Sequence, residues 1–211
     1  MAPSPEAYAE AMARLGVRDG DQVVVYDAAG LFSAARVWWL MRMMGHDLVA
    51  VLDGGLPAWR AGGHEVESGA ADPAPGGVTP RPAPSMIADA DAVAAAPQVV
   101  DARSPARFAG AEPEPREGLS AGHIPGSLSL HYRDLLAADG TMRPPAELRA
   151  AFEAAGVDLA RPIVTSCGSG VTAAILSLAL ARLGIGGTAL YDGSWTEWGA
   201  SGRPVETGAA R

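Results

Sequence analysis

The chain contains a single cysteine and no long hydrophobic run, and both features restrict the class of protein. One cysteine among 211 residues excludes an internal disulfide framework and is typical of a reducing compartment. The longest apolar stretch, residues 37–41, is bracketed by Arg36 and Arg42 and is far too short to span a bilayer. The N-terminus shows no signal peptide pattern, because no basic region is followed by an apolar one. We therefore expect a cytoplasmic protein.

Basic charge is also scarce. The 16 Lys and Arg residues are outnumbered by 24 Asp and Glu residues, which gives a net charge of −8 and argues against nucleic acid or an anionic membrane as the main partner. One cysteine and four scattered histidines have no metal-ligand spacing, so no metal site is expected. With 48% hydrophobic residues, the chain can bury a core, and its length allows one large or two small domains.

The one cysteine, Cys167, lies in a stretch that indicates an anion-binding loop. The β-branched run 163–165 predicts a buried strand, and the Ala- and Leu-rich run 173–183 predicts a helix. Gly168 and Gly170 lie between them and allow backbone N–H groups to turn inward. A strand, a glycine-bearing loop and a helix N-terminus together cradle anions, and here they should favour the nucleophilic thiolate.

A lone cysteine is more often a small buried hydrophobic residue, but a packing cysteine needs neither two glycines nor a helix start after it. A phosphatase loop is excluded, since the arginine that it needs six positions after the cysteine is Ala173. A thiol protease is disfavoured, because none of the four histidines lies in a recognisable protease context.

Helix-forming and strand-forming segments alternate in the first part of the chain, as in doubly wound parallel sheets. We expect a helix over 5–15, a strand over 22–26, a helix over 31–44, a strand over 48–52 and a short helix from 57. The first helix has Ser4 as its predicted N-cap and Tyr8, Met12 and Leu15 on one face.

The same order of elements returns in the second part of the chain, so the sequence contains an internal duplication. Corresponding residues are 140 positions apart and, after one gap, 139 apart; they pair Pro5 with Pro145, Gly16 with Gly156, Asp27 with Cys167, Gly30 with Gly170 and Trp59 with Trp198. Because Asp27 stands where the second repeat has its cysteine, the first repeat cannot perform thiol chemistry.

The two repeats differ in length. About 60 residues precede Pro145 in the second repeat, whereas nothing corresponds to them before Pro5, and domains of about 60 residues are marginal. We therefore expect a partial, inactive first domain over 1–66, N-terminally incomplete. A linker rich in Pro, Gly and Ala follows over 67–84, and a catalytic domain over 85–211.

The segment 167–172, Cys-Gly-Ser-Gly-Val-Thr, resembles the active-site loop of the rhodanese-like sulfurtransferases, in their 3-mercaptopyruvate sulfurtransferase form. Segments 100–103, 122–126 and 191–198 resemble the same family. The resemblance implies two tandem rhodanese-like α/β domains with doubly wound parallel sheets, of which the second is active. It also implies transfer of sulfur from 3-mercaptopyruvate through a Cys167 persulfide to a thiol or cyanide, with release of pyruvate and no cofactor. A thioredoxin-like reductant is a candidate acceptor.

The resemblance places the substrate arginines at Arg107 and Arg116. A guanidinium suits the carboxylate and keto oxygen of an α-keto acid, because these oxygens lie in one plane. The alternative is that both arginines are solvated partners of Glu112 and Glu114, since surface ion pairs are common. The N–H groups of residues 168–172, which include Gly168, Gly170, Val171 and Thr172, would stabilise the terminal sulfur.

Ser169 has two open roles: its hydroxyl could relay a proton to or from the departing enolate, or it could hold the loop by a hydrogen bond. The neutral loop favours mercaptopyruvate, because the thiosulfate enzymes of this family place basic residues after the cysteine. A thiosulfate sulfurtransferase and, from another class, an inactive fragment or binding module remain the alternatives. We expect structural roles for four further features: the Asp101–Arg103 pair, His123, Trp195 and Trp198.

Overall fold

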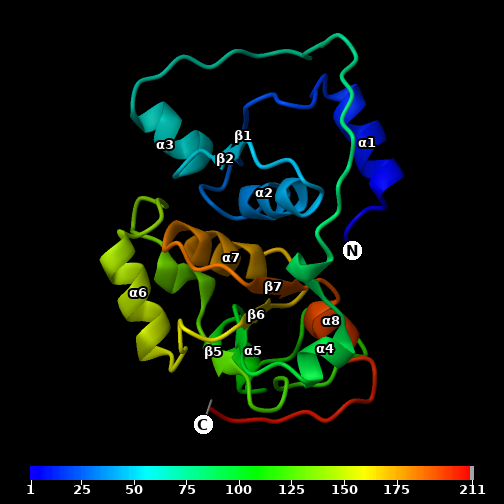
Figure 1. Cartoon of the computed structure of the whole chain (residues 1–211). Coiled ribbons are helices and arrows are strands. Elements are labelled where there is room, and N and C mark those ends of the chain that lie inside the picture. Colours follow the sequence, from blue (N-terminus) through cyan, green and yellow to red (C-terminus); the bar gives the residue numbers. More distant parts are fainter. Residues whose placement is uncertain (210–211) are drawn as a thin grey trace.

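The computed structural model describes residues 1–209 and shows two α/β units stacked on one another (Figure 1). The first unit contains α1 (Pro5–Arg14), β1 (Val23–Val25), α2 (Ala34–Met43), β2 (Val49–Val51) and α3 (Gly55–Ala61). Its two strands pair in parallel. Residues 62–83 contain neither a helix nor a named strand, but their backbone bonds to the first unit, for example from the N–H of Gly76 to the carbonyl of Ala13 at 2.9 Å.

The second unit contains a parallel sheet of five strands in the order β3-β7-β6-β4-β5. This order confirms the expected doubly wound α/β architecture. Its elements are η1 (Pro84–Met86), β3 (Ile87–Ala88), α4 (Ala90–Ala94), β4 (Val99–Asp101), α5 (Pro105–Phe108), β5 (Leu128–Ser129), η2 (Tyr132–Leu135), α6 (Pro145–Ala154), β6 (Ile163–Ser166), α7 (Ala173–Arg182), β7 (Thr188–Tyr191) and α8 (Ser194–Trp198). No helix within residues 1–209 combines the length and the apolar character that crossing a membrane requires.

Local signals in the sequence account for most element boundaries. The Ser4 side chain caps α1 by accepting a hydrogen bond from the N–H of Ala7, and Gly16 ends that helix with a φ of +75°. Tyr8 and Met12 are buried as expected. Leu15, which was predicted on the same face, is the C-cap residue of α1 and is 63% exposed.

The duplication is visible in the geometry of both units. β1 pairs with β2 in the register in which β6 pairs with β7, so that Val24 corresponds to Val164. The indole of Trp59 donates to the carbonyl of Glu65 at 2.8 Å, and that of Trp198 donates to the carbonyl of Pro204 at 2.9 Å, six residues downstream in each case. The tandem arrangement predicted from the sequence is therefore confirmed.

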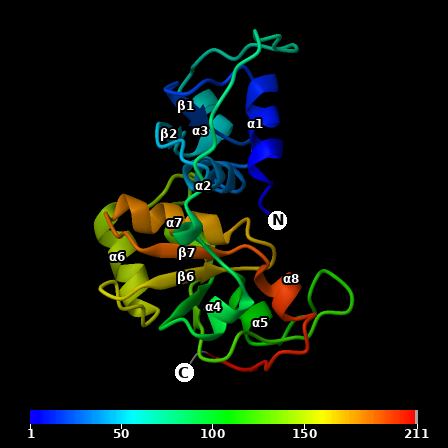
Figure 2. The same cartoon turned by 45° about the vertical axis from the view of Figure 1, so that its right-hand side comes forward.

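The two units share one apolar core, which forms where α2 of the first packs on α7 of the second (Figures 1 and 2). Trp38 and Trp39 enter this core from α2, and Leu176 and Leu180 enter it from α7. A second core lies on the opposite face of the five-stranded sheet, beneath α4 and α8. The first unit has only one of these layers, so Val24 is 60% exposed whereas Val164 is 9% exposed.

This difference in cover predicts unequal effects of one substitution at two equivalent sites. Val164→Ala should lower the free energy of unfolding by about 2 kcal/mol, because it removes two buried methyl groups and leaves a cavity. Val24→Ala should lower it by less than about 0.5 kcal/mol, since that side chain is already in contact with water. Urea unfolding of both variants measures the difference, and equal losses would contradict the assignment of an uncovered face.

Candidate active site

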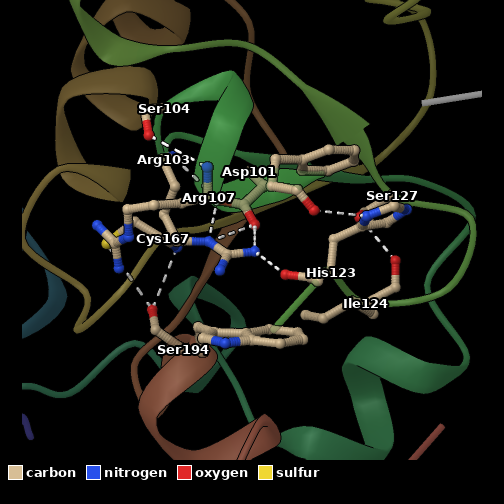
Figure 3. A network of polar contacts seen from close by, with 12 residues as sticks. Asp101, Arg103, Ser104, Arg107, His123, Ile124, Ser127, Cys167 and Ser194 are labelled. Atoms are coloured by element: carbon tan, nitrogen blue, oxygen red, sulfur yellow. Dashed lines mark hydrogen bonds and ion pairs between the residues drawn. The ribbon is translucent and has the colours of Figure 1, made fainter. Parts of the chain in front are cut away.

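Cys167 lies at the carboxyl end of β6, immediately before the loop that leads into α7. Its side chain is 1% exposed, and the N–H of Gly170 donates to Sγ at 3.1 Å. Gly170 adopts a φ of +77°, which turns its N–H back toward the sulfur. The hydroxyl of Ser194 lies 3.9 Å from Sγ on the other side and accepts a hydrogen bond from the N–H of Cys167 (Figure 3).

The start of α8 holds this loop in place. The N–H of Trp195 donates to the carbonyl of Cys167 at 2.9 Å, and both the N–H and the hydroxyl of Thr196 donate to the carbonyl of Gly168. Ser194 has a φ of +50°, the left-handed conformation that Gly55 adopts at the equivalent position of the first repeat. The alignment of the repeats contained this signal, but sequence reasoning overlooked Ser194.

The first repeat shows what the same loop does with an anion. The Asp27 carboxylate accepts hydrogen bonds from the N–H groups of Ala29, Phe32, Ser33 and Ala34 at 2.8–3.0 Å. Partial burial raises the pKa of Asp27, but these four bonds outweigh it and the pKa lies below its ordinary value. The last three donors lie at the turn into α2, where helical N–H groups lack an intrahelical acceptor, and α2 itself begins at residue 34, not at the expected 31.

The loop of the second repeat offers similar donors. Within residues 1–209, the N–H groups of Gly168, Ser169, Val171 and Thr172 donate to no protein acceptor. Four of the predicted site residues, Gly168, Ser169, Val171 and Thr172, line one cleft with Cys167, whereas Gly170 is buried behind the loop. The loop can therefore accommodate a further anionic atom next to the sulfur.

That cleft has a volume of about 430 Å³ and also contains both predicted substrate arginines, Arg107 of α5 and Arg116 of the following loop. Arg107 forms two bonds to the buried carboxylate of Glu114, from Nη2 at 2.5 Å and from Nε at 3.3 Å. Arg116 donates to the hydroxyl of Thr196. The alternative of two solvated ion pairs therefore fails for Arg116, while Arg107 has its carboxylate partner inside the cleft wall.

Beneath the arginines lies a buried ion-pair network. Arg103 donates to both carboxylate oxygens of Asp101 at 2.7–3.1 Å and to Glu114 at 2.7 Å, and its guanidinium covers the ring of Trp195 at 4.4 Å (Figure 3). Asp101 and Arg103 therefore form the expected structural pair. His123 bonds to the carbonyl of Phe108 at 2.8 Å and holds a turn, while Trp195 and Trp198 are core residues.

Several cleft residues were not predicted as site residues, among them Phe32, His131 and Tyr132. Phe32 comes from the first repeat and meets Tyr132 edge to face, with ring centroids 6.0 Å apart. Burial lowers the pKa of His131, and Arg133 adds to this shift while Asp134 opposes it. His131 and Tyr132, which follow shortly after β5, reach the site because the carboxyl ends of parallel strands share one edge of the sheet.

A second contact from the first repeat supports the loop itself. Arg36 of α2 donates to the carbonyl of Gly170 at 3.3 Å and forms an ion pair with Asp192. Both side chains are largely buried, at 12% and 5% exposure, and the N–H of Ala2 donates to the other Asp192 oxygen at 2.5 Å. The first repeat thus contacts the residue whose N–H points at the sulfur.

A strand, a cysteine loop, a helix and an arginine-lined cleft define the rhodanese-like class, and comparison with known proteins agrees. The family model described as "Rhodanese-like domain" matches residues 1–62 and 83–201. The chain belongs to this family, as its sequence motifs predicted.

Individual relatives are sulfurtransferases. The chain is 46% identical over 224 residues to thiosulfate/3-mercaptopyruvate sulfurtransferase 2 of Arabidopsis thaliana, covering 94% of this chain and 66% of that one. It is 42% identical to the 3-mercaptopyruvate sulfurtransferases of Homo sapiens and Escherichia coli, covering 98% of this chain and 72% and 75% of theirs. The crystal structure of SseA, a 3-mercaptopyruvate sulfotransferase from Escherichia coli, matches with a TM-score of 0.82 at 39% identity, covering 92% of this chain and 74% of that one. The chain thus spans about two thirds to three quarters of these relatives.

No three His, Cys, Asp or Glu side chains within residues 1–209 are grouped so that they could hold a metal ion. The expectation that the reaction needs neither metal nor cofactor stays a prediction.

The Arg36 contact predicts coupling between the first repeat and the loop. Arg36→Ala should lower the free energy of unfolding by about 3 kcal/mol, because it leaves the buried Asp192 charge without its cation. It should also slow sulfur transfer by loosening the loop at Gly170. The matched control is Arg42→Ala. Arg42 lies in the same helix, but its side chain is 40% exposed and its ion pair with Asp47 is loose, at 3.7 Å. An Arg36→Ala variant that matches Arg42→Ala in both stability and rate would refute the coupling.

Proposed function

We propose that this chain is a sulfurtransferase that moves sulfur from 3-mercaptopyruvate through a Cys167 persulfide to a thiol or cyanide. The observation that carries the proposal is the position of Cys167 in one cleft with two arginines and with loop N–H groups that have no acceptor in the described part of the chain. The names of the relatives support it, since those from Homo sapiens and Escherichia coli are 3-mercaptopyruvate sulfurtransferases. The thiosulfate alternative has support in the relative from Bos taurus, a thiosulfate sulfurtransferase at 40% identity.

In the first step the Cys167 thiolate attacks the donor sulfur. A sulfur–sulfur bond forms, the carbon–sulfur bond breaks, and its electron pair leaves as the enolate of pyruvate. The proton on the transferred sulfur then moves to the enolate carbon, which gives pyruvate and a persulfide anion. The free N–H groups of the loop stabilise this anion, as their counterparts do for the Asp27 carboxylate.

The proton transfer suggests a role for Ser169. Its hydroxyl lines the cleft and makes no hydrogen bond to a protein atom among the described residues, which supports the proton relay over the loop-holding role. In the second step an acceptor thiol or cyanide attacks the outer sulfur and regenerates Cys167. A thioredoxin-like reductant is one proposed acceptor.

We assign the chemistry to residues 85–211 and a supporting role to residues 1–66, joined by the segment 67–84. Arg36 and Phe32 are the observed contacts of the first repeat with the loop and cleft. The proposed location is cytoplasmic; one relative, from Arabidopsis thaliana, is named as mitochondrial.

The nucleophile is tested by intact-protein mass after brief exposure to 3-mercaptopyruvate, with thiosulfate in parallel. The wild-type protein should gain one sulfur atom from 3-mercaptopyruvate, and Cys167→Ser should gain none, because an oxygen nucleophile cannot form a persulfide. A gain from thiosulfate alone would favour the runner-up donor. No gain from either donor in folded protein would favour a binding module, and transfer by the serine variant would sink the mechanism.

The donor site is tested at Arg116, which has only a neutral hydroxyl partner. Arg116→Ala should raise KM for 3-mercaptopyruvate roughly tenfold or more with a smaller change in kcat, because it removes a charged bond to the donor carboxylate. Arg161→Ala, an exposed arginine outside the cleft, controls for the change in net charge. An unchanged KM in the Arg116 variant would remove this residue from the donor site.

A further inference from the structure

We infer that Glu114 makes the cleft selective for donors with a single negative charge. The inference rests on the proposed sulfurtransferase function and adds a specificity-determining residue to it. Glu114 lines the cleft with the three arginines Arg103, Arg107 and Arg116, and its side chain is only 2% exposed. It is the one carboxylate among the lining residues.

The charges of the cleft wall can be counted from their contacts. The chain has no lysine, so arginine supplies every permanent side-chain cation. Asp101 and Glu114 together neutralise two of the three arginines, since both carboxylates bind Arg103 and Glu114 also binds Arg107. Arg116 alone bonds to a neutral group, the Thr196 hydroxyl. Apart from the Cys167 thiolate, the side chains of the wall therefore carry about one uncompensated positive charge, and burial lowers the pKa of His131.

Glu114 is placed to control this balance directly. Its two carboxylate oxygens are divided between the guanidinium groups of Arg103 and Arg107, at 2.7 Å and 2.5 Å. The side chain of Arg107 also extends over the cysteine loop: its Nη2 lies 2.9 Å from where a Cβ on Gly168 would be. The Glu114 charge thus acts on an arginine that lies against the loop of Cys167, and burial leaves that charge poorly screened by solvent.

The two candidate donors differ in charge. The 3-mercaptopyruvate ion with its thiol protonated carries one negative charge, and thiosulfate carries two. The buried Glu114 charge repels both donors, and it repels the dianion about twice as strongly as the monoanion. Removing that charge would make the wall more positive by one and would help the dianion by one charge more than it helps the monoanion.

The test compares kcat/KM for thiosulfate and for 3-mercaptopyruvate, with cyanide as acceptor, in wild type and three variants. Glu114→Gln should raise the thiosulfate-to-mercaptopyruvate ratio roughly tenfold, even if the rates with both donors fall. Glu114→Asp keeps the charge but shortens the side chain, so its ratio should stay at the wild-type value. Glu112→Gln removes the same charge from an exposed position two residues away and should leave both the ratio and the rates unchanged.

An unchanged ratio in Glu114→Gln would overturn the inference and leave Glu114 a purely structural residue. An equal rise in Glu114→Asp would assign the effect to geometry, and an equal rise in Glu112→Gln would assign it to overall charge; either result would also overturn it. If Glu114→Gln does not fold, the test uses Arg116→Gln, which changes an exposed side chain. This variant should lower the thiosulfate-to-mercaptopyruvate ratio roughly tenfold, and an unchanged ratio would contradict the charge balance. Failure of the wild type to form a persulfide with either donor would instead refute the proposed function.

Discussion

The hydrogen bonds between backbone N–H groups and one anion, at the turn from a strand into a helix, are the interaction on which the active site depends. Both repeats build this turn with a glycine of positive φ, Gly30 in the first and Gly170 in the second. In the first repeat, four N–H groups bind the carboxylate of Asp27. In the second, the same backbone surrounds Cys167. The chain therefore contains two versions of one anion-binding loop, one built around a carboxylate and one around a thiol.

Much of this site could be predicted from local sequence, because strand, loop and helix N-terminus follow one another directly. The nucleophile, the loop glycines and the two arginines are brought into one region as expected, although Gly170 lies behind the loop. The fold class was predictable for a similar reason, since the alternation of strands and helices and the duplication are patterns of residue order. The start of α2, three residues later than expected, shows the limit: the composition of residues 31–33 suits a helix, but the chain there forms the turn around the Asp27 carboxylate.

The remaining features depend on contacts between residues that are distant in sequence. Arg36 and Asp192 are 156 positions apart, and no local pattern pairs them. Glu114 has two arginines close by in sequence, but one of them, Arg103, is held in place by Asp101 and by the ring of Trp195, which lies 92 positions away from it in sequence. The first repeat likewise gains its relevance to catalysis only through tertiary contacts. This repeat has Asp27 in place of the cysteine, but its helix α2 still places the Arg36 guanidinium at the Gly170 carbonyl and packs with α7 in one shared core.

Catalysis requires a site that stabilises the charge distribution of the reacting groups better than it stabilises the ground state before reaction. The Asp27 loop would be a poor catalyst in this sense, because four of its N–H groups already bind the carboxylate. Around Cys167, by contrast, one N–H contacts the resting sulfur, and four neighbouring ones have no protein acceptor within residues 1–209. A second sulfur atom bonded to Cys167 would offer those donors an anionic acceptor. Asp27 offers two oxygens, which accept four backbone hydrogen bonds, whereas Cys167 offers one sulfur, which accepts one. The exchange of carboxylate for thiol at this position therefore leaves loop N–H groups available for the second sulfur of a persulfide.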